Sequence, residues 1–90
     1  MVKPYEKDPQ ANLDYQVDWS DWLGSTDTIS TSTWTVPDGI VEESDSNTTT
    51  TATIWVSGGT LGETYDLVNH IVTTEGREDD RTIHLKLVDK

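Results

Sequence analysis

Alternation of apolar and polar residues is clearest in the last third of the chain. In Arg81–Val88, apolar residues occupy every second position from Ile83 onward, and a period of two gives a strand one apolar face and one face toward water. Thr64–Thr74 carries apolar residues on both faces, so we expect a central strand that is covered on both sides. The polar segment Glu75–Asp80 between the two strands predicts a hairpin.

Tyr65 stands at the start of the expected central strand, just after the glycine-rich segment Ser57–Glu63. Immunoglobulin-like sandwiches place a tyrosine at this corner, where its hydroxyl group bonds back to the chain that has just crossed between the sheets. The chain contains no cysteine. Such a sandwich would therefore be held without a disulfide, and a thiolate metal site is excluded.

The preceding residues predict further strands joined by short turns. Leu13–Trp19 alternates between apolar and polar residues and is the first of them. Ser20–Gly24 can form one helical turn that its serine caps and its glycine ends. The alternation slips within Asp27–Val36, which predicts a bulge or bend near Ser32. Turn signals at Pro37–Gly39 and Asp45–Asn47 then separate two more strands, Ile40–Ser44 and Thr48–Ser57.

Short strands at this spacing, without a helical period, predict an all-β, immunoglobulin-like β-sandwich of about seven strands over residues 13–90. Residues 1–12 contain Pro4 and Pro9 and few apolar side chains, so we expect an extended N-terminal arm. Such an arm can order on a neighbouring protein. Alternatively, it can fold back as an edge strand of its own domain.

Tryptophan has to supply much of the buried surface. Hydrophobic residues make up 32% of the 90 residues, and there are four tryptophans but no phenylalanine. Since a buried tryptophan removes about 150–250 Å² from water, we expect Trp19, Trp34 and Trp55 in the core. Trp22 lies in the loop after the first strand. Its ring can be exposed for contact with a sugar or a protein, or it can cap the open end of the sandwich.

The charge of the chain restricts its partners. A formal net charge of −11 argues against nucleic acid, whose phosphates would be repelled, and is compatible with a basic protein or bound cations. No apolar run is long enough to span a bilayer. Met1 opens directly into polar sequence, so we expect neither a membrane anchor nor a signal peptide.

The two histidines, His70 and His84, are candidates for a metal pair because they fall on neighbouring predicted strands. They would need a third ligand on the same face, such as Asp66. Periodicity places both histidines opposite the apolar positions, which favours two side chains that simply face solvent.

The hairpin acids offer oxygen ligands for calcium but lack the ligand spacing of a dedicated loop, so a solvated tip that two arginines partly neutralise is favoured. No nucleophile motif is present, and a sandwich of this size offers little cleft for a carboxylate pair. We therefore expect no enzymatic activity, no catalytic residues, no metal ligands and no cofactor. The acids are Glu75, Glu78, Asp79 and Asp80, and the arginines are Arg77 and Arg81.

A series of phrases spans nearly the whole chain from Lys7 onward. The phrases include Lys7-Asp8-Pro9, Asp18-Trp19-Ser20-Asp21-Trp22-Leu23, Ser32-Thr33-Trp34, Ala52-Thr53-Ile54-Trp55-Val56-Ser57-Gly58-Gly59-Thr60, Gly62-Glu63-Thr64-Tyr65 and Asp79-Asp80-Arg81. In their order and spacing, the chain resembles a family of small proteins from tailed bacteriophages and prophages. These are described as fibre-tail adaptor proteins with an immunoglobulin-like fold.

The resemblance implies a non-enzymatic virion protein that links tail fibres or peripheral baseplate parts to the tail. It would be assembled in the cytoplasm of the bacterial host and located in the phage tail. Its partners would be other tail and fibre proteins, met in several symmetry-related copies, without nucleic acid or membrane. Two alternatives stay open: a carbohydrate-binding immunoglobulin-like module with Trp22 on its binding face, and a capsid decoration or head-completion protein.

An adaptor has to contact two neighbours, and we expect the arm and the hairpin tip to do so. Prolines lower the entropy that the arm loses on docking, and its tyrosine offers an apolar anchor. The charges of the tip would meet the second neighbour. The partner-binding residues we predict are Val2, Pro4, Tyr5, Pro9, Trp22, Arg77, Asp79, Asp80 and Arg81.

Overall fold

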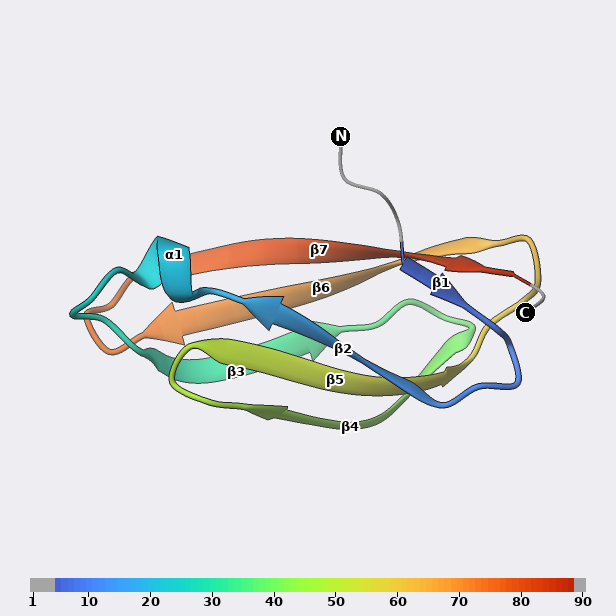
Figure 1. The fold of residues 1–90 in the computed structure, drawn as a ribbon, viewed down its shortest axis with the longest axis horizontal. Helices are drawn as coiled ribbons and strands as arrows, with labels where there is room; N and C mark the ends of the chain where they lie inside the picture. Colours follow the sequence, from blue (N-terminus) through green and yellow to red (C-terminus); the bar gives the residue numbers. More distant parts are fainter. Residues whose placement is uncertain (1–4, 89–90) are drawn as a thin grey trace.

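Seven strands and one helical turn form residues 5–88, the part of the chain that the computed structural model describes (Figure 1). The predicted ranges of β2, α1 and β6 agree with the structure to within one residue, but Ser20 lies within α1 and does not cap it. In chain order, the elements are β1 (Tyr5–Lys7), β2 (Leu13–Asp18), α1 (Ser20–Leu23), β3 (Ile29–Thr35), β4 (Ile40–Asn47), β5 (Thr51–Gly58), β6 (Thr64–Thr73) and β7 (Glu78–Leu87).

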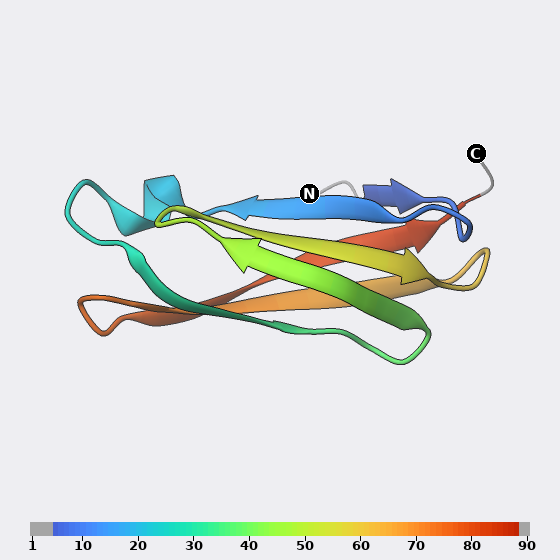
Figure 2. The ribbon, with the colours of Figure 1, turned by 90° about the horizontal axis from the view of Figure 1, so that it is seen from below.

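The strands form two sheets that pack face to face. The four-stranded sheet has the order β1-β7-β6-β3 and the three-stranded sheet the order β2-β5-β4, and Figure 2 shows the two layers from the side. All neighbouring pairs are antiparallel except β1 and β7. The second, fifth and fourth strands thus share one sheet, and the third, sixth and seventh share the other, as in immunoglobulin-like sandwiches. The predicted fold class is confirmed.

Tyr65 makes the corner contact that the sequence predicts. Its hydroxyl oxygen accepts a hydrogen bond from the backbone N–H of Thr60 at 3.0 Å, across the loop between β5 and β6. Gly39, just before β4, has a φ of 99°, and a Cβ there would lie 3.0 Å from the Tyr65 ring. Glycine is therefore required at this position, both for the positive φ and for the close approach of the ring.

The core lies between the inner faces of the two sheets. Trp19 is fully buried, and its Nε1 donates a hydrogen bond to Oδ1 of Asn69 on β6 at 2.9 Å. The Asn69 amide nitrogen donates in turn to Ser32 Oγ and Thr33 O on β3, so this buried polar group is satisfied and links three segments. The apolar core comes mostly from alternate strand positions: Tyr15, Val17, Leu23, Ile29, Ile40, Ile54, Val56, Leu67, Ile71, Ile83, Leu85 and Leu87.

Trp55 is not a core residue, so the expectation for this ring was wrong. Ile54 and Val56 on β5 are fully buried, whereas Trp55 is 42% exposed. Because successive side chains of a strand point to opposite faces, the inward position of Ile54 places Trp55 on the outer face. Trp34 on β3 is partly buried and packs against the core.

Two local expectations and one expectation about layers were also wrong. β4 continues through Asn47, and the chain turns after it, where the Thr48 hydroxyl accepts hydrogen bonds from the backbone N–H groups of Thr50 and Thr51. The bulge in β3 lies directly after Ile29 rather than near Ser32. β6 is an interior strand of its sheet, but the sandwich has only two layers, so Val68 and Val72 are half-buried on its outer face.

The expected arm contributes the seventh strand. Tyr5–Lys7 forms β1 and pairs with the end of β7, which is the fold-back alternative for this segment. Lys7 is fully buried, and its Nζ donates to the carbonyl oxygens of Asp8 and Gly58 at 2.9 and 2.8 Å. These bonds offset the cost of burying an ammonium group. The arm residues Val2 and Pro4 lie outside the described residues.

Candidate functional site

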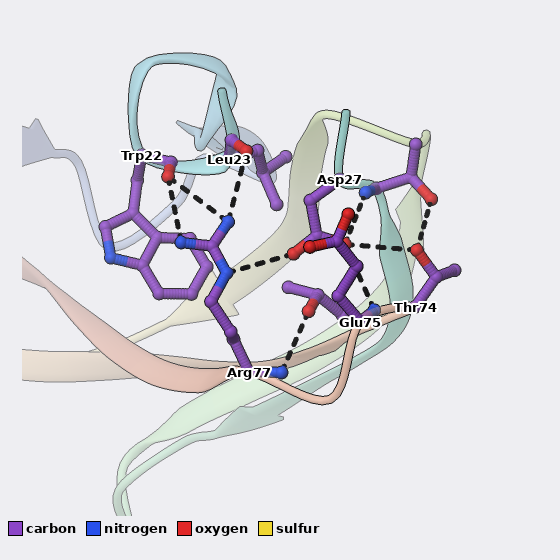
Figure 3. A network of polar contacts seen from close by, with 8 residues as sticks. Trp22, Leu23, Asp27, Thr74, Glu75 and Arg77 are labelled. Atoms are coloured by element: carbon purple, nitrogen blue, oxygen red, sulfur yellow. Dashed lines mark hydrogen bonds and ion pairs between the residues drawn. The ribbon is translucent and has the colours of Figure 1, made fainter. Parts of the chain in front are cut away.

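One end of the sandwich is closed by side-chain contacts between α1 and the turn that joins β6 to β7 (Figure 3). The guanidinium group of Arg77 lies 4.3 Å from the centroid of the Trp22 ring. Its Nε donates to Asp27 Oδ2 at 3.0 Å, and its Nη2 donates to Leu23 O at 3.1 Å. The planar donor pattern of arginine can satisfy a carboxylate and a carbonyl group at the end of a helix at the same time.

Asp27 is the centre of this end of the molecule, and only 1% of its side chain is exposed. Besides the bond from Arg77, its carboxylate accepts hydrogen bonds from the Thr28 N–H, the Thr74 hydroxyl group and the Glu75 N–H. Burial alone would raise the pKa of Asp27, but the hydrogen bonds that it accepts lower the pKa to about 2. The carboxylate is therefore ionised at neutral pH and holds the guanidinium group in place.

A second arginine is stacked in the same way. The guanidinium group of Arg81 on β7 lies 4.4 Å from the centroid of the Trp19 ring and donates to Asp18 O at 3.0 Å. The Trp19 and Trp22 rings meet edge to face with centroids 5.3 Å apart. Two cation–π contacts thus fix α1 on the hairpin. The Arg77 contact covers one face of the Trp22 ring, which is half-buried and packs against the core.

The acidic side chains of the hairpin point to solvent. On the outer face of the four-stranded sheet, His70 Nδ1 lies 2.5 Å from Asp80 Oδ1, and His70 Nε2 lies 3.1 Å from Glu78 Oε1. The contact with Asp80 is the main cause that raises the pKa of His70 above its usual value. Desolvation partly opposes this effect, and Glu78 adds to it. Asp79 is exposed, and its carboxylate accepts a hydrogen bond from the Asp80 N–H.

His84 is paired separately from His70. Its Nδ1 lies 2.7 Å from Oδ1 of Asp66, the residue considered as a third ligand for a histidine pair. Within residues 5–88, no group of three His, Asp or Glu side chains has an arrangement that would hold a metal ion. The same part of the chain encloses no detectable pocket.

The helix α1 has four residues, and no helix in the described range is long and apolar enough to cross a membrane.

The predicted contact residues fall into two regions of the fold. Trp22, Arg77 and Arg81 belong to the contacts that close one end, and the exposed acids Asp79 and Asp80 lie beside them. Figure 1 places β1, which includes the predicted residue Tyr5, away from this end. Pro9 lies in the turn that follows β1, where the Ala11 N–H donates to Asp8 O. The structure therefore brings the hairpin residues together with Trp22 but not with the arm.

Trp55 marks a second surface, on the outer face of the three-stranded sheet. In register it lies opposite Asp14 of β2 and Ser44 of β4. Val41, which is 54% exposed, pairs with Ser57 and lies on the same face. We name Trp55, Val41, Asp14 and Ser44 the Trp55 face. The strict alternation of β5 is the sequence signal that would have identified this face. Its apolar residues Ala52, Ile54 and Val56 occupy the inward positions, which leaves Trp55 on the outer face.

The fold and these surfaces define a class of protein, that of a small immunoglobulin-like module whose exposed side chains offer contacts to other molecules. The family model described as podophage GP4 fiber-tail adaptor protein gp77 matches residues 7–86, so the chain belongs to this family. The resemblance found in the sequence is thereby confirmed. The family consists of structural tail adaptors, a non-enzymatic role, and its members are virion components. A search of curated protein sequences found no significant match.

Proposed function

We propose that this chain links tail fibres or peripheral baseplate parts to the tail of a podophage. The match of the adaptor family over residues 7–86 carries this proposal. Its partners are other tail and fibre proteins, which it contacts in several symmetry-related copies, and it joins the tail during assembly in the host cytoplasm.

The hairpin tip, by which we mean the turn after β6 and the first three residues of β7, is suited to one of the two neighbours. Its acidic residues are exposed, and the contacts of Arg77 and Arg81 hold the hairpin against α1. A surface that is already ordered loses little entropy on binding. Its charge would attract a basic neighbour and orient it. The acids concerned are Glu75, Glu78, Asp79 and Asp80.

The Trp55 face is suited to the other neighbour. An exposed tryptophan beside an exposed valine, with polar residues around them, has the composition of an interface centre. The hairpin tip belongs to the four-stranded sheet, whereas the Trp55 face belongs to the three-stranded sheet. Two neighbours can therefore bind at the same time, as an adaptor requires. β1 is a less suitable connector, because its backbone pairs with its own β7.

Particles assembled without the protein provide the test. Their tails should lack fibres, and the wild-type protein supplied during assembly should restore them. Trp55→Ala alone, and Glu75→Gln combined with Asp79→Asn, should each reduce fibre attachment while the melting temperature stays near that of the wild type. We choose Glu75 and Asp79 because neither contacts His70. A double variant at other exposed turn acids, Asp38→Asn with Glu63→Gln, has the same charge change and should assemble normally.

Cryo-EM of the particles distinguishes the alternatives. Density for the protein between tail and fibre is the expected result. Density on the head, or fibres attached to tails that lack the protein, would overturn the proposal.

A further inference from the structure

Three of the four sheet edges carry features that discourage another chain from adding a strand. β1 is only three residues long. β2 exposes Asp14 and Asp18, and β4 has three acidic residues and a bulge between Glu42 and Ser44. Short length, charge and bulges are the usual protections of a free edge.

The edge strand β3 has none of these protections over Thr31–Thr35. This segment contains only threonine, serine and tryptophan, and it pairs in regular register with β6. Among the strands of residues 5–88, none lies on its other side, where Figure 2 shows β3 at the border of its layer. Alternate residues of an antiparallel edge strand direct their N–H and C=O groups away from the neighbouring strand. The segment therefore offers backbone groups to an additional strand.

The space beside this edge is acidic on its inner side. Glu42 and Asp45 of β4 are opposite Val56 and Ile54, which are fully buried, so both carboxyl groups start from the inner face of their sheet. They remain exposed because β4 is an edge strand on the same side of the sandwich as β3 (Figure 1). The neighbouring Asp45 carboxyl group raises the pKa of Glu42. Among residues 5–88, neither forms a salt bridge with a basic side chain.

Trp34, in the same segment of β3, provides independent evidence that a hydrogen-bond acceptor is missing on this side of the sandwich. Its Nε1 is the one buried side-chain nitrogen or oxygen atom in the described range that lacks a hydrogen-bond partner. A buried donor without an acceptor costs free energy.

We propose that β3 accepts an extended segment of a neighbouring tail protein as an added strand, and that this segment carries basic residues at alternate positions. The added strand would extend the four-stranded sheet, and every second side chain would point inward toward Glu42 and Asp45. Lysine or arginine at those positions would favour the ionised form of Glu42 and pair with both carboxylates. The intervening side chains would lie on the outer face beside Thr31, Thr33 and Thr35.

A second copy of this chain would be a poor occupant of the edge. Each copy carries a net charge of −11, and pairing between two β3 strands would bring two acidic β4 strands toward one another. Moreover, β3 has no lysine or arginine to offer the carboxyl groups. The observations therefore favour a basic segment from a different protein.

The inference rests on the proposed function, but its test uses the full-length protein alone, so the two can fail separately. The probe is a synthetic peptide of alternating lysine and valine with the length of β3, and the control peptide has glutamate in place of lysine. Calorimetry measures the affinity, and amide hydrogen exchange followed by NMR locates the binding site. We expect the basic peptide to bind and to slow the exchange of alternate amides within Thr31–Thr35.

Charge variants then test the inner acids. Glu42→Gln combined with Asp45→Asn should weaken binding of the basic peptide about two- to fivefold. The pair Asp38→Asn with Glu63→Gln, which removes at least as much negative charge, should leave it unchanged. The inference would be overturned by absence of binding, by protection of β1 or β2 instead of β3, by equal binding of the acidic peptide, or by equal weakening in both double variants. Fibre attachment in assembled particles tests the proposed function separately.

Discussion

Arg77 Nε donates a hydrogen bond to Asp27 Oδ2 at 3.0 Å, although the two residues lie 50 positions apart in the chain. The carboxylate is buried, whereas the arginine side chain is 43% exposed and lies over the Trp22 ring. A buried acid thus positions a surface arginine, which in turn holds α1 by its last carbonyl groups. These side-chain contacts reinforce the backbone hydrogen bonds at this end of the sandwich, such as that from the Thr74 N–H to Thr28 O.

Replacement of this arginine should loosen the end of the sandwich. Arg77→Ala should lower the free energy of unfolding by about 1–3 kcal/mol, because the bonds to the α1 carbonyl groups and the stack on Trp22 are lost. Arg77→Lys keeps the charge but not the planar set of donors, so it should recover only part of the loss. Urea denaturation followed by tryptophan fluorescence measures both variants. A lysine variant as stable as the wild type would show that charge alone is sufficient.

The depressed pKa of Asp27 predicts how stability changes in acid. Its pKa is about 2 in the folded protein and 3.8 in the unfolded chain. The folded state therefore binds the proton less readily, and the contribution of Asp27 is fully present above 3.8 and is lost as the pH falls toward 2. Asp27→Asn should be less stable than the wild type at neutral pH. The difference in stability between the two proteins should become smaller as the pH falls from 3.8 toward 2. Thermal unfolding at several pH values measures the gap, and a constant gap would contradict the assignment.

The parts of the fold that the sequence predicted depend on neighbours along the chain. A strand with one buried face must alternate, so β2 and β6 were predicted almost to the residue. The corner contact of Tyr65 was predicted from its place just after the glycine-rich segment, and its partner Thr60 lies only five residues away.

The parts that the sequence did not predict depend on partners far apart in the chain. The strand character of β1 follows from the register with β7 and from the bond between Lys7 and Gly58, 51 residues away. Asp27 was missed as the centre of the candidate site for the same reason, since nothing near it in the sequence marks Arg77 as its partner. The error at Trp55 had a different origin: the alternation of β5 was visible, but the size of the ring was given more weight.

The acid pair on β4 should make the protein less stable as the pH rises from acid to neutral. The hydrogen bond with Asp45, together with partial desolvation, raises the pKa of Glu42 to about 7 from an ordinary value of 4.5. A raised pKa in the folded state means that the contribution is fully present below 4.5 and is lost as the pH rises through about 7. The wild-type melting temperature should fall across this range, and Glu42→Gln should make the fall smaller.

His70 acts in the same direction and provides the control for this measurement. Its pKa is raised above the ordinary 6.5 by Asp80 and Glu78, so its contribution is present below 6.5 and is lost as the pH rises through the folded value. His70→Gln should therefore remove the upper part of the fall and leave the lower part intact. A Glu42→Gln profile that coincides with the wild-type profile would contradict the raised pKa of Glu42.

Lys7 should be required for the full stability of the sandwich even though it belongs to the segment expected to be an arm. Burial lowers the pKa of its ammonium group, and the charge of Asp8 partly offsets this shift by raising the pKa. The ammonium group donates hydrogen bonds to two carbonyl oxygens. Lys7→Ala should lower the free energy of unfolding by about 1.5–3 kcal/mol, because these carbonyl groups lose a charged donor. A chain that starts at Ala11 also lacks β1 and should lose at least as much.

Lys86 offers a matched control, since it lies on β7 but is exposed. Lys86→Ala should change the free energy of unfolding by less than about 0.5 kcal/mol. A chain starting at Ala11 that melts like the wild type would mean that β1 does not stabilise the domain, and the arm would again be available as the connector.

Trp19 and Trp55 should differ sharply when each is replaced by alanine. Trp19 has no exposed surface and bonds to Asn69, so Trp19→Ala should cost about 3–5 kcal/mol, as other large cavities in a core do. Trp55 is 42% exposed on the outer face, and Trp55→Ala should cost no more than about 1 kcal/mol. Urea denaturation followed by circular dichroism compares them without reliance on the deleted fluorophore. If Trp55→Ala were as costly as Trp19→Ala, the ring would be structural, and reduced fibre attachment in that variant would reflect unfolding rather than a lost contact.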